Sequence, residues 1–249
     1  MHLDYADPTL SPFDEFQRFK THPSIARLLE GATRISYGAR SLTAGGLQAI
    51  PDLAFEGGGL IGCAAGFMNA PRLKAIHNAI LSGIGAADAV GDAITSGRQH
   101  DRIVDLGHHI LSTGIEKELT GVRNLKPLWS RFGTLLGAFL GGFDMWFQTI
   151  FQFSLFGTLK HGKTDAQATG EAKDFAPIDY PKPDGRLSFD RLTNVAFSFT
   201  NHEESQPAHL RLKDPSVPIS VNLPKYAEPA QRYCPAGVYE VVGEGADAR

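Results

Sequence analysis

Cysteine is scarce in this chain of 249 residues, which has only Cys63 and Cys234. Two cysteines cannot build the framework of bridges that stabilises small secreted domains. The chain is also long enough to bury the core of one large domain or two small ones. We therefore expect a globular protein of a reducing compartment without a disulfide scaffold.

An excess of charge of one sign is missing as well. Lys and Arg number 24, Asp and Glu number 27, and the formal net charge is −3. Proteins that bind nucleic acid typically carry a basic patch or stripe. The interspersed charges of this chain give no such pattern, so we expect no nucleic-acid partner.

The first residues, Met-His-Leu-Asp-Tyr-Ala-Asp-Pro, contain neither a basic region nor an apolar run. They therefore lack the features of a secretory signal peptide, and the arginine-rich pattern of a transit peptide is absent too. Two expectations stay open: a bacterial protein on the cytoplasmic side, or a sequence whose true start lies upstream.

The most informative stretch that is present runs from Glu56 to Val90. The pattern predicts a short apolar strand over Leu60–Cys63, a turn of small residues and a helix that begins at Pro71. Free backbone N–H groups at such a helix N-terminus can hold a phosphate or the electron-rich edge of a flavin. An ordinary strand–helix unit explains the same pattern. The apolar side chains of one helix face are Leu73, Ile76, Ile80, Ile84 and Ala87.

Three glycines of this stretch, Gly57, Gly59 and Gly62, match the dinucleotide fingerprint Gly-x-Gly-x-x-Gly as letters. That fingerprint follows a strand and opens a helix. These glycines precede the predicted strand, so we reject the match.

Four segments carry a resemblance to a known family. They are Gly-Leu-Gln-Ala-Ile-Pro-Asp-Leu (46–53), Leu-Ile-Gly-Cys-Ala-Ala-Gly-Phe-Met-Asn (60–69), Pro-Ala-His-Leu-Arg-Leu-Lys-Asp (207–214) and Tyr-Cys-Pro-Ala-Gly-Val-Tyr-Glu (233–240). The chain resembles electron-transfer flavoprotein–ubiquinone oxidoreductases over nearly its whole length. Because the family proteins are much longer, the resemblance implies a C-terminal portion that is truncated at both ends.

The resemblance implies an α+β fold of four parts. Residues 1–55 would end a quinone-binding region, and residues 56–126 would form the C-terminal part of an α/β FAD-binding domain. Residues 127–163 would form a hydrophobic, membrane-associated helical segment. Residues 164–249 would form a small, incomplete ferredoxin-like iron–sulfur domain, after a linker whose composition shifts to Pro, Asp and Lys.

Local patterns predict the remaining elements. Ser11-Pro12 opens a helix through Lys20, and Pro23 starts a second helix that stops at Gly31. Residues 97–123 read as a polar helix. A core-facing stripe in the first helix would comprise Phe13, Phe16 and Phe19. Short strands are predicted over 34–37, 47–50, 53–55, 187–189, 195–199, 217–221 and 238–242.

Residues 132–159 contain one formal charge, Asp144, and glycines stand four apart at Gly133, Gly137 and Gly141. This spacing is typical of closely packed membrane helices. Three interpretations compete: a transmembrane helix, a monotopic segment or hairpin in the membrane interface, and a buried core helix. Polar side chains at every fourth position, from Asp144 to Gln152, argue against full immersion in lipid and favour the monotopic segment.

Asp101, Asp105 and His108 fall at helical spacing, with two further histidines beside them. A metal site would need such ligands fixed in a defined geometry. A solvated helix face explains the same residues, and we favour that interpretation.

The resemblance implies that FAD lies against the turn from Gly62 to Pro71. Gly66 would let the backbone approach the flavin ring, and backbone N–H groups of the next three residues would stabilise negative charge at its pyrimidine edge. Asn69 could also donate a side-chain hydrogen bond. The predicted cofactor-binding residues are Gly62, Gly66, Phe67, Met68 and Asn69. Cys63 is expected to be a packing residue.

Cys234-Pro235 matches the cysteine–proline end of an iron–sulfur signature, and the resemblance makes Cys234 the first ligand of a [4Fe–4S] cluster. Such a cluster needs four thiolates, and the other three ligands would follow Arg249. We therefore expect the chain alone to bind neither a cluster nor FAD.

The function implied by the resemblance is electron transfer from reduced electron-transfer flavoprotein to ubiquinone through FAD and the cluster. No general acid, base or nucleophile is expected. For the quinone, only broad candidates arise, Thr33 to Ile50 and the aromatic residues of 132–156. The expected location is a membrane surface, either the cytoplasmic side of a bacterial inner membrane or the mitochondrial inner membrane. The alternatives are a membrane-surface module or remnant without redox activity, and a related flavin-dependent quinone or geranylgeranyl-type oxidoreductase.

Overall fold

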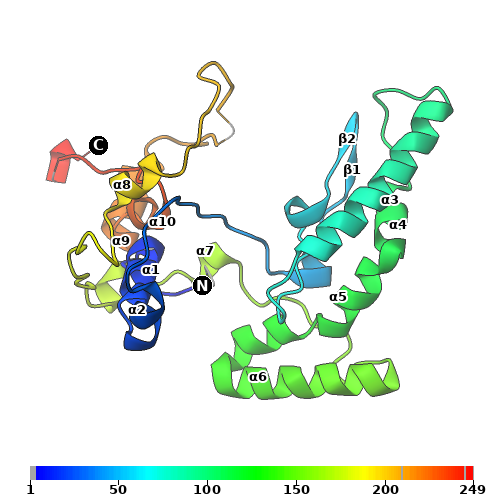
Figure 1. Ribbon diagram of the computed structural model, residues 1–249, viewed down its shortest axis with the longest axis horizontal. Coiled ribbons are helices and arrows are strands. Elements are labelled where there is room, and N and C mark those ends of the chain that lie inside the picture. The colour runs from blue at the N-terminus through cyan, green and yellow to red at the C-terminus, as the bar shows by residue number, and fades with distance from the viewer. Residues whose placement is uncertain (1–3, 209, 244, 249) are drawn as a thin grey trace. The chain divides into compact units, whose positions relative to one another are not determined.

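The computed structural model describes residues 4–208, 210–243 and 245–248 (Figure 1). The chain divides into two compact units. Unit 1 comprises Met1–Arg40 and Lys163–Arg249, and unit 2 comprises Ser41–Gly162. Each unit is described by itself below.

Unit 1 is built from short helices, and no strand occurs among its described residues. Its first two helices are α1 (Pro12–Lys20) and α2 (Pro23–Leu29). The others are α7 (Asp165–Ala168), η4 (Ala172–Asp174), α8 (Arg191–Ala196), η5 (Pro218–Asn222), α9 (Leu223–Tyr226), α10 (Ala230–Tyr233) and η6 (Gly245–Asp247).

The predictions for α1 and α2 are confirmed. The Ser11 side chain accepts the N–H of Asp14 and so caps α1, and proline occupies the first turn of both helices. Gly31 follows α2 with a φ of +72°. The expected core stripe of α1 is only partly confirmed: Phe13 is buried, but Phe16 and Phe19 are more than half exposed.

The strands predicted over 187–189, 195–199, 217–221 and 238–242 are wrong. The Asp190 side chain accepts the N–H of Thr193 at 2.8 Å and so caps a helix, α8, where a strand was expected. Pro218 likewise stands in the first turn of η5. Capping and proline therefore overrode the apolar alternation. The strand predicted over 34–37 is absent too.

Unit 2 contains the only strands of the described chain, β1 (Ala54–Phe55) and β2 (Gly58–Gly59), which pair antiparallel with Ala54 opposite Gly59. The strand predicted over 53–55 is thus shortened, and that over 47–50 is replaced by the helical turn η1 (Gly46–Ala49). The other helices are η2 (Gly62–Ala64), α3 (Ile76–Thr95), α4 (Leu106–Ile110), η3 (Leu111–Ile115), α5 (Glu116–Val122) and α6 (Leu125–Phe151).

The central stretch does not form the predicted strand, turn and helix. Residues 60–63 are not a strand, because the turn η2 begins at Gly62. The following helix, α3, begins at Ile76 rather than at Pro71. Asn69 pairs with Lys74 in an isolated antiparallel bridge, which closes a turn around Pro71 and delays the helix.

The apolar face of α3 is not the face that is buried. Ile76, Ile80 and Ile84 are each more than half exposed. A Cβ on Gly85 would lie 2.7 Å from the carbonyl oxygen of His109, so the absence of a side chain lets α3 approach α4 closely. The residues of α3 that are buried are small or polar: Asn78, Ser82, Gly85, Ala89 and Ala93.

The predicted polar helix over 97–123 forms from Leu106 onward as α4, η3 and α5. Gly114, with a φ of +109°, kinks this run. Leu106, Ile110 and Leu119 are buried with Leu53 and Phe67 in the core of unit 2. The helices therefore supply most of the core, and the small sheet adds one edge to it.

Helix α6 is a hairpin of two helical segments. Gly133, with a φ of +72° and a ψ of −174°, interrupts the helix and reverses the chain. A Cβ on Gly137 would lie 2.5 Å from Cα of Trp129, and one on Gly141 would lie 3.2 Å from Cα of Leu125. The glycines spaced by four thus let the second segment lie directly against the first.

The described chain is therefore rich in helix with one two-stranded sheet. Among the described residues, no helix has both the length and the apolar character needed to cross a bilayer. The α+β expectation holds only in this coarse form.

Candidate functional site

Cys234 lies at the end of α10, in a loop that turns back on the thiol. The residue is only 8% exposed. The N–H of Val238 donates to Sγ at 3.4 Å. Gly237, with a φ of +65°, gives the loop its turn. The sulfur therefore sits in a pocket made largely of backbone.

Two opposing effects act on the pKa of the Cys234 thiol. Burial raises it, and backbone N–H groups of Val238, Ala236, Gly237 and Tyr239 lower it by hydrogen bonding to the sulfur. The balance places the pKa below its ordinary value. The loop therefore favours the thiolate, the form of cysteine that binds metal ions.

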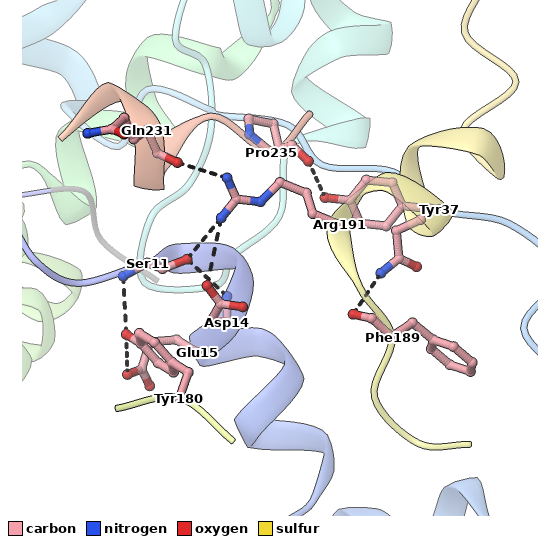
Figure 2. Close-up of polar contacts among 10 residues, drawn as sticks. Ser11, Asp14, Glu15, Tyr37, Tyr180, Phe189, Arg191, Gln231 and Pro235 are labelled. Atoms are coloured by element: carbon pink, nitrogen blue, oxygen red, sulfur yellow. Dashed lines mark hydrogen bonds and ion pairs between the residues drawn. The ribbon is translucent and has the colours of Figure 1, made fainter. Parts of the chain in front are cut away.

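Arg191, the first residue of α8, supports this loop from one side (Figure 2). One of its guanidinium nitrogens donates to the carbonyl oxygen of Gln231 at 2.8 Å. The other lies 3.4 Å from Oγ of Ser11 and 3.7 Å from the carboxylate of Asp14. The guanidinium thus ties α10 to the start of α1.

Tyr37 supports the loop at a second point, because its hydroxyl donates to the carbonyl oxygen of Pro235 at 3.1 Å (Figure 2). Its backbone N–H donates to the carbonyl oxygen of Phe197. Sequence reasoning missed both Arg191 and Tyr37. The one sequence feature beside the cysteine that could have indicated a close contact was Gly237. In the structure, a Cβ at this position would lie 3.1 Å from Cδ of Arg191.

Among the described residues, no group of three or more His, Cys, Asp and Glu side chains could hold a metal ion. Asp105 is 3.3 Å from His109, and Asp101 pairs with Arg98. The role of Cys234 as one ligand of a four-iron cluster therefore stays a prediction, and the other free cysteine, Cys63, belongs to unit 2.

The residues predicted to bind a flavin lie together in the turn that precedes α3. Gly62 and Gly66 have φ values of +58° and +84°, which only glycine adopts without strain. The N–H of Gly62 donates to Oγ of Ser82 at 2.9 Å, and the N–H of Phe67 donates to the carbonyl oxygen of Gly62 at 3.3 Å. Met68 is 9% exposed, and Cys63 is partly buried in η2.

Asn69 is fully buried and bonded within unit 2. Its backbone N–H donates to Lys74 at 2.9 Å, and its side-chain amide donates to the carboxylate of Glu118 at 2.6 Å. Its side-chain oxygen accepts the N–H of Arg72 at 3.2 Å. The flavin fits this turn only in part: Gly66 permits close backbone approach, but the donors of Phe67 and Asn69 are already engaged. Their cofactor role stays a prediction.

Glu118 joins this turn to α3. Its carboxylate also lies 2.8 Å from Nε2 of His77. Burial raises the pKa of Glu118, but hydrogen bonds from Asn69 and His77, together with the charges of His77 and Arg72, lower it more, so the pKa lies below its ordinary value. Asn69 and His77 therefore favour the charged form of Glu118, and Glu118 in turn holds the side chain of Asn69 in place.

The hairpin α6 exposes an apolar stripe along its second segment. Leu135 is 88% exposed and Phe139 is 70% exposed. The opposite side is held by polar contacts: Asp144 is buried, accepts the side-chain amide of Asn124 at 3.0 Å and accepts the hydroxyl of Ser154 at 2.6 Å. The stripe comprises Phe132, Leu135, Leu136, Phe139, Phe143, Trp146 and Ile150, with Phe153 and Leu155 after the helix.

Family models match both ends of the chain. Residues 1–42 match the model described as "ETF-QO, ubiquinone-binding", and residues 185–249 match "Electron transfer flavoprotein-ubiquinone oxidoreductase, 4Fe-4S". Both matched segments lie in unit 1 apart from residues 41–42, and Cys234 lies in the second. The matches define a class, the oxidoreductases with quinone-binding and iron–sulfur domains.

Curated relatives agree with the family models. The chain is 50% identical over 246 residues to the mitochondrial electron transfer flavoprotein-ubiquinone oxidoreductase of Bos taurus, covering 96% of this chain and 39% of that protein. It is 47% identical over 241 residues to that of Pseudomonas aeruginosa, covering 96% of this chain and 43% of that protein. The chain is thus similar to electron transfer flavoprotein–ubiquinone oxidoreductases along almost its whole length, and it spans about two fifths of the length of these relatives.

Proposed function

We propose that this chain is part of an enzyme that transfers electrons from reduced electron-transfer flavoprotein to ubiquinone. The observation that carries the proposal is the Cys234 loop, in which four backbone N–H groups hydrogen-bond to a buried sulfur and lower the pKa of the thiol, within the segment matched by the iron–sulfur family model. Hydrogen bonds to the ligand sulfur are among the features that set the reduction potential of iron–sulfur clusters. Arg191 and Tyr37 hold this loop in position.

Cys234 supplies one thiolate of a [4Fe–4S] cluster in this proposal, and the other three come from outside this chain. A bound cluster supplies one-electron transfer, and a bound flavin accepts electrons in pairs or singly. In unit 2, the turn of Gly62 to Asn69 would border the flavin, with Gly66 at the closest approach. Glu118 would keep the Asn69 amide fixed, and residues 1–42 contribute to the quinone-binding region.

The enzyme proposal is tested by a chimera. The 249 residues replace the corresponding segment of the Pseudomonas aeruginosa relative, and the purified chimera is assayed for reduction of ubiquinone by reduced electron-transfer flavoprotein. We expect activity within about tenfold of the parent protein, since the sequences are 47% identical over the exchanged segment. A folded chimera that binds FAD and transfers no electrons would contradict the proposal.

The isolated chain is expected to show neither flavin nor cluster absorbance after anaerobic incubation with FAD, iron and sulfide. For the cluster, the reason is that Cys234 and Cys63, the two cysteines of the sequence, are fewer than the four ligands that a cubane cluster requires. For the flavin, the reason is that the donors of Phe67 and Asn69 are already engaged within unit 2. Stoichiometric FAD or a four-iron cluster in the isolated chain would overturn this part of the proposal.

The exposed stripe of α6 supports a monotopic membrane contact. Aromatic and aliphatic side chains on one side of a hairpin, with polar contacts on the other, are typical of segments that lie in the interface. Arg131 donates to the carbonyl oxygen of Lys160 at 2.9 Å, which brings two cationic residues together beside the hairpin. The same stripe favours a second candidate function, a membrane-surface module without redox activity.

Leu135→Ser combined with Phe139→Ser is expected to reduce binding of the chain to phospholipid vesicles by about tenfold or more. The reason is that the variant lacks two highly exposed apolar side chains whose transfer from water into the membrane favours binding. Co-flotation with vesicles measures the binding. The matched control combines Ile35→Ser with Leu192→Ser, which are 80% and 75% exposed in unit 1. Equal losses in both double variants would exclude the stripe as the membrane contact.

A further inference from the structure

A pocket of about 650 Å³ lies within unit 1, away from the Cys234 loop in sequence. Its walls come from the end of α2, the extended chain after Gly31 and the loop that precedes α8. Three arginines line it, Arg27, Arg34 and Arg186. Neither the proposed cluster ligand nor the turn before α3 belongs to it.

Arg34 is held in this wall between two aromatic rings. Its guanidinium carbon lies 4.0 Å from the ring centre of Phe189 and 4.2 Å from that of Phe197. One terminal nitrogen donates to the side-chain oxygen of Asn194 at 2.9 Å. Stacking and this bond fix the plane of the guanidinium, as in sites where arginine recognises planar oxyanions.

The Nε–H of Arg34 is buried and has no hydrogen-bond partner among the described residues. An unpaired charged donor is costly, and native structures usually satisfy it. The edge formed by Nε and the second terminal nitrogen is the one that binds carboxylate or phosphate through two parallel hydrogen bonds.

Among the described residues no carboxylate forms an ion pair with Arg34, although hydrogen bonds from Thr193, with the nearby charge of Arg34, lower the pKa of Asp190. One carboxylate oxygen of Asp184 accepts the backbone N–H groups of Arg186, Leu187 and Ser188, at 2.8–2.9 Å. Glu30 is exposed. Lys20 adds a further positive charge beside the pocket. Its ammonium lies 5.1 Å from the ring centre of Phe189, which lines the pocket. Burial lowers the pKa of Lys20, and the nearby charge of Arg34 lowers it further.

The wall also has an apolar part, beside the polar side chains of Glu30, Thr33 and Asp184. Leu29, Leu187 and the two phenylalanine rings line the pocket beside the arginines. We propose that this pocket binds a small organic anion, in which a phosphate or carboxylate group contacts Arg34 and Arg186 and an aromatic or apolar portion lies against the phenylalanines. This site goes beyond the proposed electron transfer and requires neither FAD nor the cluster.

The test uses three probes: phenyl phosphate, inorganic phosphate and phenol, which carry both parts of the proposed ligand, the anion alone and the ring alone. The ¹⁵N-labelled chain in a non-ionic detergent is titrated at pH 6, and the Nε–H resonance of Arg34 is followed by NMR. Its assignment comes from its loss in Arg34→Lys. The variant Arg186→Gln removes one charge from the pocket, and Arg211→Gln removes an equal charge from an exposed position that does not line it.

We expect phenyl phosphate to shift the Arg34 resonance saturably, inorganic phosphate to do so with at least fivefold weaker affinity, and phenol to leave it unchanged. Arg186→Gln should weaken phenyl phosphate binding at least fivefold, and Arg211→Gln should change it less than twofold. No saturable shift, a shift with phenol, equal affinities for the two phosphates, or equal effects of the two variants would each overturn the proposal.

Discussion

At the scale of single residues, the Glu118 carboxylate organises the turn before α3. It accepts the Asn69 amide at 2.6 Å and lies 2.8 Å from His77. Removal of a charged acceptor leaves a fully buried amide without its partner. Sequence reasoning selected Asn69 and missed Glu118, because a carboxylate 49 residues away carries no local signal.

Glu118→Gln is expected to lower the free energy of unfolding of unit 2 by about 1–3 kcal/mol. Urea denaturation at pH 7 measures the loss. Glu116→Gln, on the same helix but exposed, is the matched control and should change stability by less than about 0.5 kcal/mol. Equal effects of the two substitutions would show that the carboxylate does not hold the turn.

The pH dependence of this effect has a defined sign. The pKa of Glu118 is lower in the folded chain than its ordinary value of 4.5. A carboxyl group with a depressed pKa contributes stability above its unfolded value, and that stability is lost as the pH falls through the folded value. The difference between wild type and Glu118→Gln should therefore shrink below pH 4.5. A difference that grows on acidification would contradict the assignment.

Tyr180 provides an independent test in unit 1. Its hydroxyl accepts the N–H of Ser11 at 3.1 Å and donates to Glu15 at 3.0 Å (Figure 2). Burial, with the neighbouring Glu15, raises the pKa of Tyr180 from 10.0 to about 12. The folded state holds this proton more tightly than the unfolded state, so the associated stability is complete below pH 10 and is lost as the pH rises toward 12.

Tyr180→Phe should therefore be less stable than wild type at pH 8, and the difference should narrow above pH 10. Thermal unfolding across this range, with absorbance at 295 nm to follow tyrosine ionisation, gives both quantities. A constant difference up to pH 12 would show that Tyr180 ionises normally in the folded chain.

At the scale of elements, glycine decides where helices meet. Gly137 faces the backbone of Trp129 across the α6 hairpin, whereas a Cβ on Gly142 would meet nothing within 4 Å. Both glycines lie in the same helical segment of α6, but only Gly137 lies against another part of the chain. The hairpin therefore depends on the first glycine and not on the second.

Gly137→Ala is expected to destabilise the hairpin by about 1–3 kcal/mol through steric overlap. Gly142→Ala should stabilise it by about 0.5–1 kcal/mol, because alanine has the higher helix propensity. Chemical denaturation in a non-ionic detergent compares the two. A destabilising effect of Gly142→Ala as large as that of Gly137→Ala would exclude the observed packing.

The elements also show how far the sequence predicts this fold. Helices with explicit start and stop signals, such as α1 with its Ser11 cap, were predicted correctly. The buried face of α3 was not predicted, because the isoleucines share one face, whereas the close contact is made by Gly85 and the buried face includes Ser82. The strand predictions were wrong where a short apolar run contained a helix-capping residue or a proline. Periodicity reports where apolar residues lie on a helix, but the contacts that bury one face are long-range.

At the scale of the whole molecule, two independent features indicate one kind of protein. The Cys234 loop in unit 1 surrounds a buried sulfur with backbone N–H groups that lower the pKa of its thiol, and the α6 hairpin in unit 2 has an exposed apolar stripe. Of the candidate site, Cys234 was selected from its motif and the resemblance, and its role as a ligand stays a prediction. Arg191 and Tyr37, which position its loop, come from segments distant in sequence and were visible only in the structure.

The most direct test of the proposed function is the low-temperature EPR spectrum of the reduced chimera with the Pseudomonas aeruginosa relative. Cys234→Ser should abolish or strongly alter the signal of the four-iron cluster, because one of its four thiolates is lost. Cys63→Ser, at the other cysteine, should leave the signal unchanged. A cluster signal that survives Cys234→Ser unaltered, or that disappears with Cys63→Ser, would contradict the assignment of Cys234 as the cluster ligand.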